Sequence, residues 1–214
     1  MTRLAIIDYG SGNLRSVSKA FAHVAPGMDI TITSSLHDIA SASHMVLPGV
    51  GAYGDCMRGL QALPGMLEAM RAHVFTHRKW FLGICVGMQM LFEEGHEHGV
   101  HQGLGWLKGK VVALATHHSP LKIPHMGWNE LRITQPHPLL AGVKNGDHAY
   151  FVHSYAADGV EPDALLAVTE YGQTIPAIVG RDNLFGTQFH PEKSQETGLR
   201  ILRNFVELPH GHPR

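Results

Sequence analysis

The segment KWFLGICVGMQMLF, residues 79–92, decides the fold expected for this chain. Its apolar run at residues 80–84 suits a strand that is buried on both faces of a sheet. Apolar residues then repeat at helical spacing over residues 88–92, which indicates a helix. Cys85 is therefore expected on a turn that leads from a strand into a helix.

Gly83 and Gly87 flank Cys85 at the spacing of the G-x-S-x-G nucleophile elbow, with sulfur in place of oxygen. Glycines permit the sharp turn that exposes such a nucleophile. The free N–H groups and positive dipole end of the next helix favour a thiolate. On this motif alone two interpretations stay open, a catalytic nucleophile or a small buried core residue.

Length and composition restrict the class of protein. The 214 residues predict one α/β domain over residues 1–214, since no linker divides them. A formal net charge of −1 gives no basic face for nucleic acid, and no apolar run is long enough to span a membrane. The amino terminus enters a strand directly and lacks a signal-peptide pattern, so we expect a cytoplasmic protein. Only two cysteines occur, so no disulfide framework is expected, and Cys56 is interpreted as a packing residue.

The predicted fold class is α/β, with a mostly parallel central sheet and helices on both faces. Strands alternate with helical patterns in the first half of the chain, which places a site at the carboxyl ends of the strands. Short strands with few helix-length gaps follow, so we expect antiparallel additions to the sheet. The expected strands cover residues 4–7, 29–33, 44–47, 80–84, 110–114, 130–133, 149–154, 165–169, 177–180 and 184–189, and expected helices include residues 56–63, 66–76 and 194–206.

Two glycine-rich loops follow expected strands. Residues 48–54, PGVGAYG, allow unusual peptide orientations and could aim backbone N–H groups at a developing oxyanion beside a nucleophile. The alternative is an ordinary turn before the next helix. The loop at residues 10–13 has neither the G-x-G-x-x-G pattern nor a P-loop lysine, so its glycines are interpreted as turn residues.

Histidines and one glutamate crowd residues 96–101, and a second His-rich stretch occupies residues 210–212. A metal site is not expected, because no second cluster completes a tetrahedral set of ligands. The neighbouring glycines fit a mobile surface loop. We expect no cofactor either.

The sequence His190-Pro191-Glu192 follows the last expected strand. Residues i and i+2 of an extended chain face the same way, so Glu192 can lie beside His190. A carboxylate that binds one ring nitrogen leaves the other nitrogen free to accept a proton from a thiol. Cys85, His190 and Glu192 would then supply a nucleophile, a base and an orienting group.

Three motifs together resemble the class I, triad-type glutamine amidotransferases, which have a flavodoxin-like fold. They are residues 47–51 (LPGVG), 83–89 (GICVGMQ) and 188–192 (QFHPE), and the resemblance covers nearly the whole chain. It implies that Cys85 attacks the side-chain amide of glutamine, that His190 shuttles the proton, and that Glu192 orients the histidine. Ammonia leaves, and water resolves the γ-glutamyl thioester.

The resemblance also implies a binding site. The oxyanion hole would combine the N–H of Val86 with one from Val50 or Gly51. Gln89 would contact bound glutamine, although an exposed helix position is its alternative interpretation. The remaining implied substrate contacts are Gly51, Glu97 at the α-amino group, and the backbone of His153, Ser154 and Tyr155 at the α-carboxylate.

Within the family, the likeness is greatest to the glutaminase subunits of imidazole glycerol phosphate synthases, from histidine biosynthesis. It is carried by residues 8–13, 124–129, 150–155 and 193–194. The last expected helix ends near Val206, so the ammonia acceptor is expected on another chain. The resemblance implies that this partner is a (βα)₈-barrel cyclase, contacted by Asn13, Trp128 and Lys193. For Trp128, a core position is the alternative.

If the Val50–Gly51 peptide can rotate, the oxyanion hole stays incomplete until the partner binds its own substrate. We then expect the isolated chain to hydrolyse glutamine only very slowly.

Three rival interpretations of the function remain. A free-standing γ-glutamyl hydrolase is disfavoured by Gln89 and by the stretches around Trp128 and Lys193. A subunit serving a pyridoxal phosphate synthase is disfavoured by residues 124–129, and a non-catalytic binding subunit by the intact triad.

Overall fold

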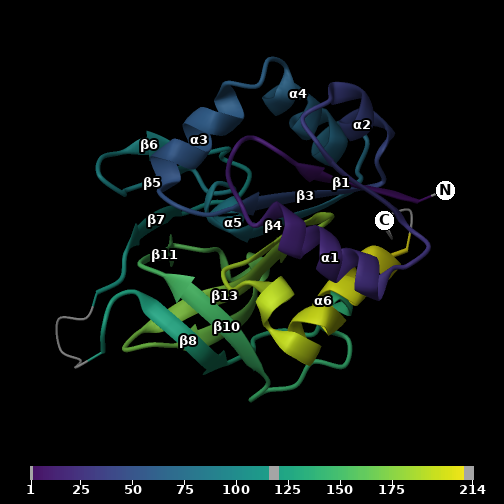
Figure 1. Cartoon of the computed structure of the whole chain (residues 1–214). Coiled ribbons are helices and arrows are strands. Elements are labelled where there is room, and N and C mark those ends of the chain that lie inside the picture. Colours follow the sequence, from purple (N-terminus) through teal and green to yellow (C-terminus); the bar gives the residue numbers. More distant parts are fainter. Residues whose placement is uncertain (1, 116–120, 210–214) are drawn as a thin grey trace.

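The centre of the molecule is an eight-stranded sheet, seen in a computed structural model that describes residues 2–115 and 121–209 (Figure 1). Neighbouring strands are parallel from β2 to β14 and antiparallel from β14 to β9. In spatial order they are β2 (Asp29–Thr33), β1 (Arg3–Ile7), β3 (His44–Gly49), β4 (Trp80–Cys85), β14 (Leu184–Thr187), β13 (Thr174–Arg181), β12 (Leu165–Glu170) and β9 (Arg132–Ile133). The predicted α/β class, with a parallel sheet extended by antiparallel strands, is confirmed.

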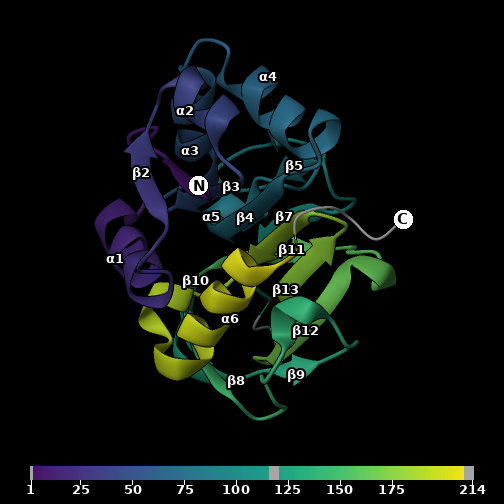
Figure 2. The same cartoon turned by 90° about the vertical axis from the view of Figure 1, so that its right-hand side faces the viewer.

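Helices cover both faces of the parallel part of the sheet (Figures 1 and 2). On one face α1 (Leu14–Val24) packs against α6 (Gln195–Glu207), and the rings of Phe21 and Phe205 lie 6.2 Å apart between them. The other face carries α2 (Leu36–Ser41), α3 (Tyr53–Gln61) and α4 (Met66–Arg71), which a π-helical turn extends as η1 (Ala72–Thr76). This layering buries strands β1, β3 and β4 almost completely, which explains their apolar sequences.

Two smaller sheets stand beside the main one. One pairs β8 (His125–Glu130) with β10 (His148–His153), antiparallel. The other has the order β11 (Tyr155–Asp158), β7 (Lys110–Ala113), β5 (Glu94–Gly95) and β6 (His101–Gln102). Single 3₁₀ turns, η2 (Pro138–Leu140), η3 (Pro162–Ala164) and η4 (Pro191–Lys193), occupy three of the connections.

Several sequence predictions about elements were wrong. The helix expected after Cys85 is a single turn, α5 (Val86–Gln89). The strand expected over residues 130–133 is divided, because β8 ends at Glu130 and β9 begins at Arg132. Strand β8 itself was not predicted, since it contains Gly127 at a φ of +128° and lacks β-branched residues.

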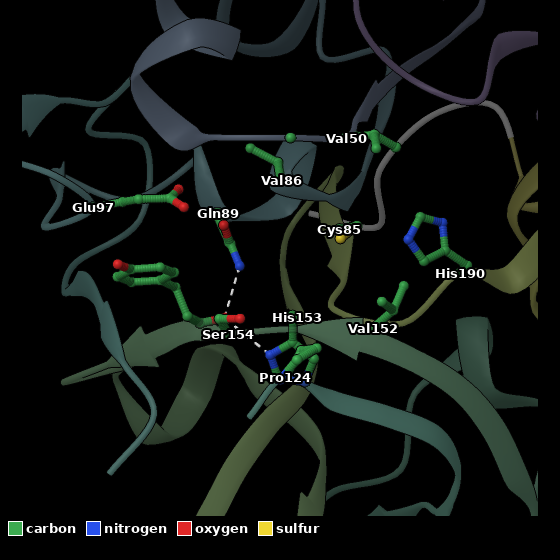
Figure 3. Close-up of a pocket in the computed structure, with 12 residues that line it drawn as sticks. Val50, Cys85, Val86, Gln89, Glu97, Pro124, Val152, His153, Ser154 and His190 are labelled. Carbon is green, nitrogen blue, oxygen red and sulfur yellow. Dashed lines mark hydrogen bonds between the residues drawn. The ribbon is translucent and has the colours of Figure 1, made fainter. Parts of the chain in front are cut away.

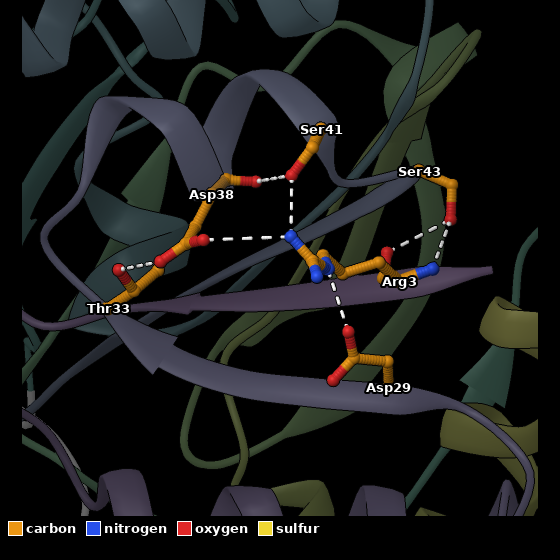
Figure 4. A network of polar contacts seen from close by, with 6 residues as sticks. All are labelled: Arg3, Asp29, Thr33, Asp38, Ser41 and Ser43. Carbon is orange, nitrogen blue, oxygen red and sulfur yellow. Dashed lines mark hydrogen bonds and ion pairs between the residues drawn. The ribbon is translucent and has the colours of Figure 1, made fainter. Parts of the chain in front are cut away.

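A polar network holds the edge of the parallel sheet together (Figure 4). The Arg3 guanidinium on β1 donates to Asp29 of β2 at 2.8 Å and to Ser41 of α2 at 2.9 Å. Asp38 of α2 lies 3.6 Å from the same guanidinium and accepts from Thr33 at 2.7 Å. Strands β1 and β2 are therefore tied to α2 by charge as well as by packing.

Two further expectations concern the His-rich stretch near the carboxyl terminus and the absence of membrane-spanning segments. The His-rich stretch 210–212 lies outside the described residues. Among the helices of the described ranges, none combines the length and apolar character that crossing a bilayer requires.

Candidate active site

Strand β4 delivers Cys85 to a strained turn at the carboxyl edge of the sheet. Cys85 has a φ of +55° and a ψ of −113°, values that L-residues rarely adopt. Glycine is required around it for packing: a Cβ on Gly87 would lie 1.8 Å from the Leu47 carbonyl oxygen, and one on Gly83 would lie 2.5 Å from the Gly87 oxygen. The elbow predicted from the sequence is confirmed as a backbone feature.

His190 and Glu192 follow β14 and meet at the same edge. The His190 Nδ1–H donates to Glu192 Oε1 at 2.8 Å, and both side chains are almost completely buried. The backbone holds the histidine from both sides, because its N–H donates to the Tyr150 carbonyl and its own carbonyl accepts from the Ser194 hydroxyl. Figure 3 shows the Cys85 sulfur and the His190 ring at one end of the same pocket.

The environment of His190 favours its charged form. Burial lowers the pKa of His190, but interactions with Cys85 and Glu192 outweigh burial and raise the pKa to about 9. At neutral pH the imidazole therefore carries a proton and can pair with a Cys85 thiolate. The helix after Cys85, α5, is only one turn long, so the helix dipole at the sulfur is weaker than the sequence led us to expect.

The cavity beside these residues has a volume of about 280 Å³. Cys85 and His190 lie at one end, while Glu97 lies at the other (Figure 3). The lining residues include most of those predicted from the sequence, namely Val50, Gly51, Cys85, Val86, Gln89, Glu97, His153, Ser154, Tyr155 and His190, together with Pro124 and Val152.

Gln89 and Glu97 are both fixed by backbone partners. Gln89 is only 3 % exposed, so the exposed position considered for it is wrong; its Nε2 donates to the Tyr155 carbonyl at 2.9 Å. Glu97 Oε2 accepts from the Tyr53 N–H at 2.6 Å, at the start of α3. This bond caps α3 and holds the carboxylate at the cavity wall.

The segment after β10 is held by a row of neutral side chains. His153 Nδ1 donates to the Tyr155 carbonyl at 2.9 Å, and His153 Nε2 accepts from His125 Nδ1 at 2.9 Å. His125 is stacked between the rings of Phe151 and Tyr171. Burial lowers the pKa of both histidines to about 4, so they are uncharged at neutral pH and each ring carries a single proton.

Val50, expected at the oxyanion hole, is bound to Ser11 on both sides of its Cα atom. Its N–H donates to Ser11 Oγ at 3.4 Å, and its carbonyl accepts from the same hydroxyl at 2.6 Å. The Cys56 thiol lies 3.5 Å from that carbonyl, so this cysteine contacts the loop as well as packing in the core. In this conformation the Val50 N–H is occupied and is not available to an oxyanion.

The three residues expected to meet a partner lie close to the triad. Trp128 is 47 % exposed, so the core position considered for it is wrong. Its ring meets that of Tyr150 edge-on, and the ammonium of Lys193 lies over the Tyr150 ring. Asn13 Nδ2 lies 3.4 Å from Glu192 Oε1, so this residue touches the carboxylate that binds His190.

Sequence reasoning assigned no role to Gln188, His125 or Ser11. Gln188 was quoted in a motif, but its contact with Cys85 joins segments 103 residues apart. Gln89, which orients the Gln188 amide, lies 99 residues from it in the sequence. His125 gave no signal of its own, because the strand that carries it was not predicted. Ser11 gave none.

Within residues 2–115 and 121–209, no group of three or more His, Cys, Asp or Glu side chains is arranged to hold a metal. His96 bonds to Glu94 at 2.7 Å, and His101 donates to the Glu97 carbonyl at 3.0 Å. His96 and His101 are therefore engaged in local structure.

A family model described as glutamine amidotransferase class-I matches residues 5–208. The chain belongs to the class I glutamine amidotransferases. The elbow cysteine, the buried histidine–glutamate pair and the adjoining cavity are thus found in a family whose name describes transfer of the glutamine amide nitrogen.

Curated relatives with similar sequences include several proteins named HisH. This amidotransferase is 51 % identical over 212 residues to the imidazole glycerol phosphate synthase subunit HisH of Brucella abortus, covering 96 % of this chain and 98 % of the relative. It is 50 % identical over 209 residues to the protein of the same name from Rhodospirillum rubrum, covering 95 % and 98 %. The HisH protein of Agrobacterium fabrum is 52 % identical over 211 residues, with the same coverage.

Solved structures support the fold. A glutamine amidotransferase superimposes with a TM-score of 0.72 at 18 % identity, covering 95 % of this chain and 97 % of the other. The PurLQS structure from Thermotoga maritima gives a TM-score of 0.70 at 18 % identity, covering 96 % and 97 %. At such identities the agreement concerns the fold alone.

Proposed function

We propose that the chain, as a single glutaminase domain over residues 1–214, is the glutaminase subunit of an imidazole glycerol phosphate synthase in histidine biosynthesis. It hydrolyses glutamine to glutamate and ammonia and passes the ammonia to a cyclase subunit. One observation carries the chemistry: the elbow thiol of Cys85 and the imidazole of His190 line one cavity of about 280 Å³, and the buried Glu192 carboxylate holds that imidazole from behind. The likeness to HisH subunits over nearly the full chain supports the pathway.

The reaction follows from the charges of the site. The Cys85 thiolate attacks the side-chain carbonyl carbon of glutamine and forms a tetrahedral oxyanion. The His190 imidazolium gives its proton to the amide nitrogen, and ammonia leaves as the γ-glutamyl thioester forms. Neutral His190 then takes a proton from water as the water attacks the thioester, and glutamate and the thiolate are released. Glu192 keeps His190 Nδ1 protonated throughout.

Substrate recognition uses the other end of the cavity. Glu97 offers a carboxylate to the α-amino group, at the opposite end from the sulfur (Figure 3). The backbone of residues 153–155 receives the α-carboxylate, and Gln89 contacts the bound glutamine from the cavity wall. Val86 supplies one oxyanion N–H group, and Val50 or Gly51 supplies the other.

The acceptor enzyme is a (βα)₈-barrel cyclase that binds a phosphorylated ribonucleotide and forms a heterodimer with this chain. Its docking face is the surface of Trp128, Tyr150 and Lys193, where an aromatic anchor and a cation stand next to the triad. Asn13 belongs to the same face through its contact with Glu192. We place the enzyme in the cytoplasm, whose reducing conditions keep the Cys85 thiol free.

Regulation rests on the bonds of Val50 with Ser11. While both bonds are made, the oxyanion hole lacks the Val50 N–H, and glutamine is hydrolysed slowly. Docking of the cyclase with its ligand breaks these bonds and rotates the Val50–Gly51 peptide, so that the N–H of Val50 or Gly51 completes the hole. The isolated chain therefore hydrolyses glutamine only very slowly.

The test is to follow glutamate release by the purified chain, alone and with a (βα)₈-barrel cyclase and its ribonucleotide ligand. The expected result is slow release alone, acceleration by the cyclase and ligand, and no release with Cys85→Ser. Rapid hydrolysis that the cyclase leaves unchanged would instead identify a free-standing γ-glutamyl hydrolase. No hydrolysis in any mixture would identify a non-catalytic binding subunit.

A further inference from the structure

Gln188 is a buried amide that the triad mechanism does not use. It follows strand β14, is 0 % exposed, and is fixed by its backbone N–H, which donates to the Ala177 carbonyl. Its side-chain Nε2 lies 3.9 Å from the Cys85 sulfur. Gln188 lies outside the set of twelve described residues that line the cavity, so it reaches the sulfur from within the protein rather than from the substrate side.

The direction of the Gln188 amide is settled by its neighbours. Gln89 Nε2 lies 2.9 Å from the Tyr155 carbonyl, and a carbonyl can only accept, so the nitrogen of Gln89 must face it. The same nitrogen lies 3.1 Å from the oxygen of Gln188. Turning the Gln188 amide round would bring two NH₂ groups together and place an oxygen against the sulfur. The NH₂ group of Gln188 therefore faces Cys85.

The Tyr155 carbonyl that fixes this direction is itself anchored. It accepts a second hydrogen bond from His153 Nδ1 at 2.9 Å (Figure 3). His153 is held in the required tautomer because its Nε2 accepts from His125 Nδ1, and His125 Nε2 accepts from Asn129 Nδ2 at 3.2 Å. In this row each donor faces an acceptor, so only one arrangement of protons is possible. The row runs from Asn129 through His125, His153, the Tyr155 carbonyl, Gln89 and Gln188 to the Cys85 sulfur.

We propose that Gln188 is a further catalytic residue, whose side-chain amide donates a hydrogen bond to the Cys85 thiolate and stabilises the charged nucleophile. This inference rests on the proposed function and extends it. Gln188 transfers no proton. It stabilises the thiolate before attack and again when the thioester breaks down, while His190 alone carries the proton between steps. Gln89 acts through Gln188 as a positioning residue, in addition to its contact with substrate.

The test measures how fast iodoacetamide alkylates Cys85 in the full chain as a function of pH, with mass spectrometry to separate Cys85 from Cys56. Gln188→Met keeps the length of the side chain and removes its N–H donors. Because a hydrogen bond to a charged group is lost, the midpoint of the alkylation profile should move up by about one pH unit. Alkylation below that midpoint should slow about tenfold, since the thiolate is the species that reacts.

Thr187→Val is the matched control. Thr187 is the neighbouring residue, equally buried, and its hydroxyl donates to the Phe189 carbonyl rather than to the sulfur. It should leave the alkylation profile unchanged while costing similar stability. In steady-state assays Gln188→Met should lower kcat at neutral pH and leave KM for glutamine unchanged, because Gln188 does not line the cavity.

A folded Gln188→Met protein with the alkylation profile of the natural chain overturns the proposal. If Gln188→Met does not fold, Gln89→Met decides, because it removes the group that orients Gln188: a shift toward higher pH supports the proposal, and an unchanged profile refutes it. The readout is independent of the proposed function. A chain that releases no glutamate from glutamine still reports the reactivity of its thiol.

Discussion

At the scale of single residues, the site depends on how a few buried groups set each other's charge. Interactions with Cys85 and Glu192 raise the pKa of His190 in spite of its burial, so this ring is protonated. His125 and His153 stay neutral, because burial lowers the pKa of each and no acidic group offsets it. The same residue type is thus charged in one place and neutral in a neighbouring one, which fits the role of proton carrier proposed for His190.

Replacing Glu192 with Gln should reduce kcat by about 10²- to 10⁴-fold, because the imidazole loses its orienting carboxylate. The natural enzyme should lose activity as pH rises through about 9, where His190 gives up its proton. In the Glu192→Gln variant the negative charge beside the imidazole is gone, so the pKa of His190 falls and this loss should begin at lower pH. The measurement is the pH profile of kcat/KM, and an unmoved basic limb would contradict the assignment.

Replacing Ser11 with Ala should raise glutamate release by the isolated chain about tenfold. The variant removes both bonds that hold the Val50 peptide groups, each worth about 1 kcal/mol. Ser43→Ala is the control, since that hydroxyl bonds to Arg3 and His44, at the network on the edge of the sheet. Unchanged release without the cyclase would show that Ser11 does not restrain the loop.

At the scale of elements, the sheet could be predicted because its strands have clear sequence patterns. The apolar runs at β1, β3 and β4 match burial on both faces, and the triad could be placed because the strand ends of a parallel sheet meet at one edge. Strand β8 could not be predicted, because half of its residues are exposed and the other half gain their partners from distant segments, β10 and the end of β12. The bond of Gln188 with Gln89 was hidden for the same reason, as it joins segments distant in sequence.

Gly87→Ala tests the packing of the elbow. An added Cβ would collide with the Leu47 carbonyl, which is backbone and cannot move aside, so the free energy of unfolding should fall by about 3 kcal/mol. Gly27→Ala, where an added Cβ meets no atom within 4 Å, should leave stability almost unchanged. Urea denaturation measures both. Equal stability of the two variants would argue against a close approach of β3 and α5.

At the scale of the whole molecule, the active site and the proposed docking face are neighbours. Trp128, Tyr150 and Lys193 form one group, and η4 carries both Lys193 and the triad carboxylate. A partner that covers this face stands close to the bond from which ammonia leaves.

Trp128→Ala should weaken binding of the cyclase by about 2 kcal/mol, or roughly 30-fold, because buried aromatic anchors dominate interfaces of this kind. Alkylation of Cys85 should be unaffected. Phe75→Ala, which removes another partly exposed aromatic residue on η1, serves as the control and should bind normally. Titration calorimetry measures both affinities, and unchanged binding by Trp128→Ala would place the interface elsewhere.

Strand β8 has two faces that serve different purposes. His125, Gly127 and Asn129 alternate with Met126, Trp128 and Glu130, so one set turns inward to the histidine row while the other turns to solvent. The outward set can change over generations to suit a different acceptor enzyme while the inward set keeps the chemistry intact. In the proposed complex, the outer side chains of these six residues contact the acceptor enzyme and the inner ones support the site that makes ammonia.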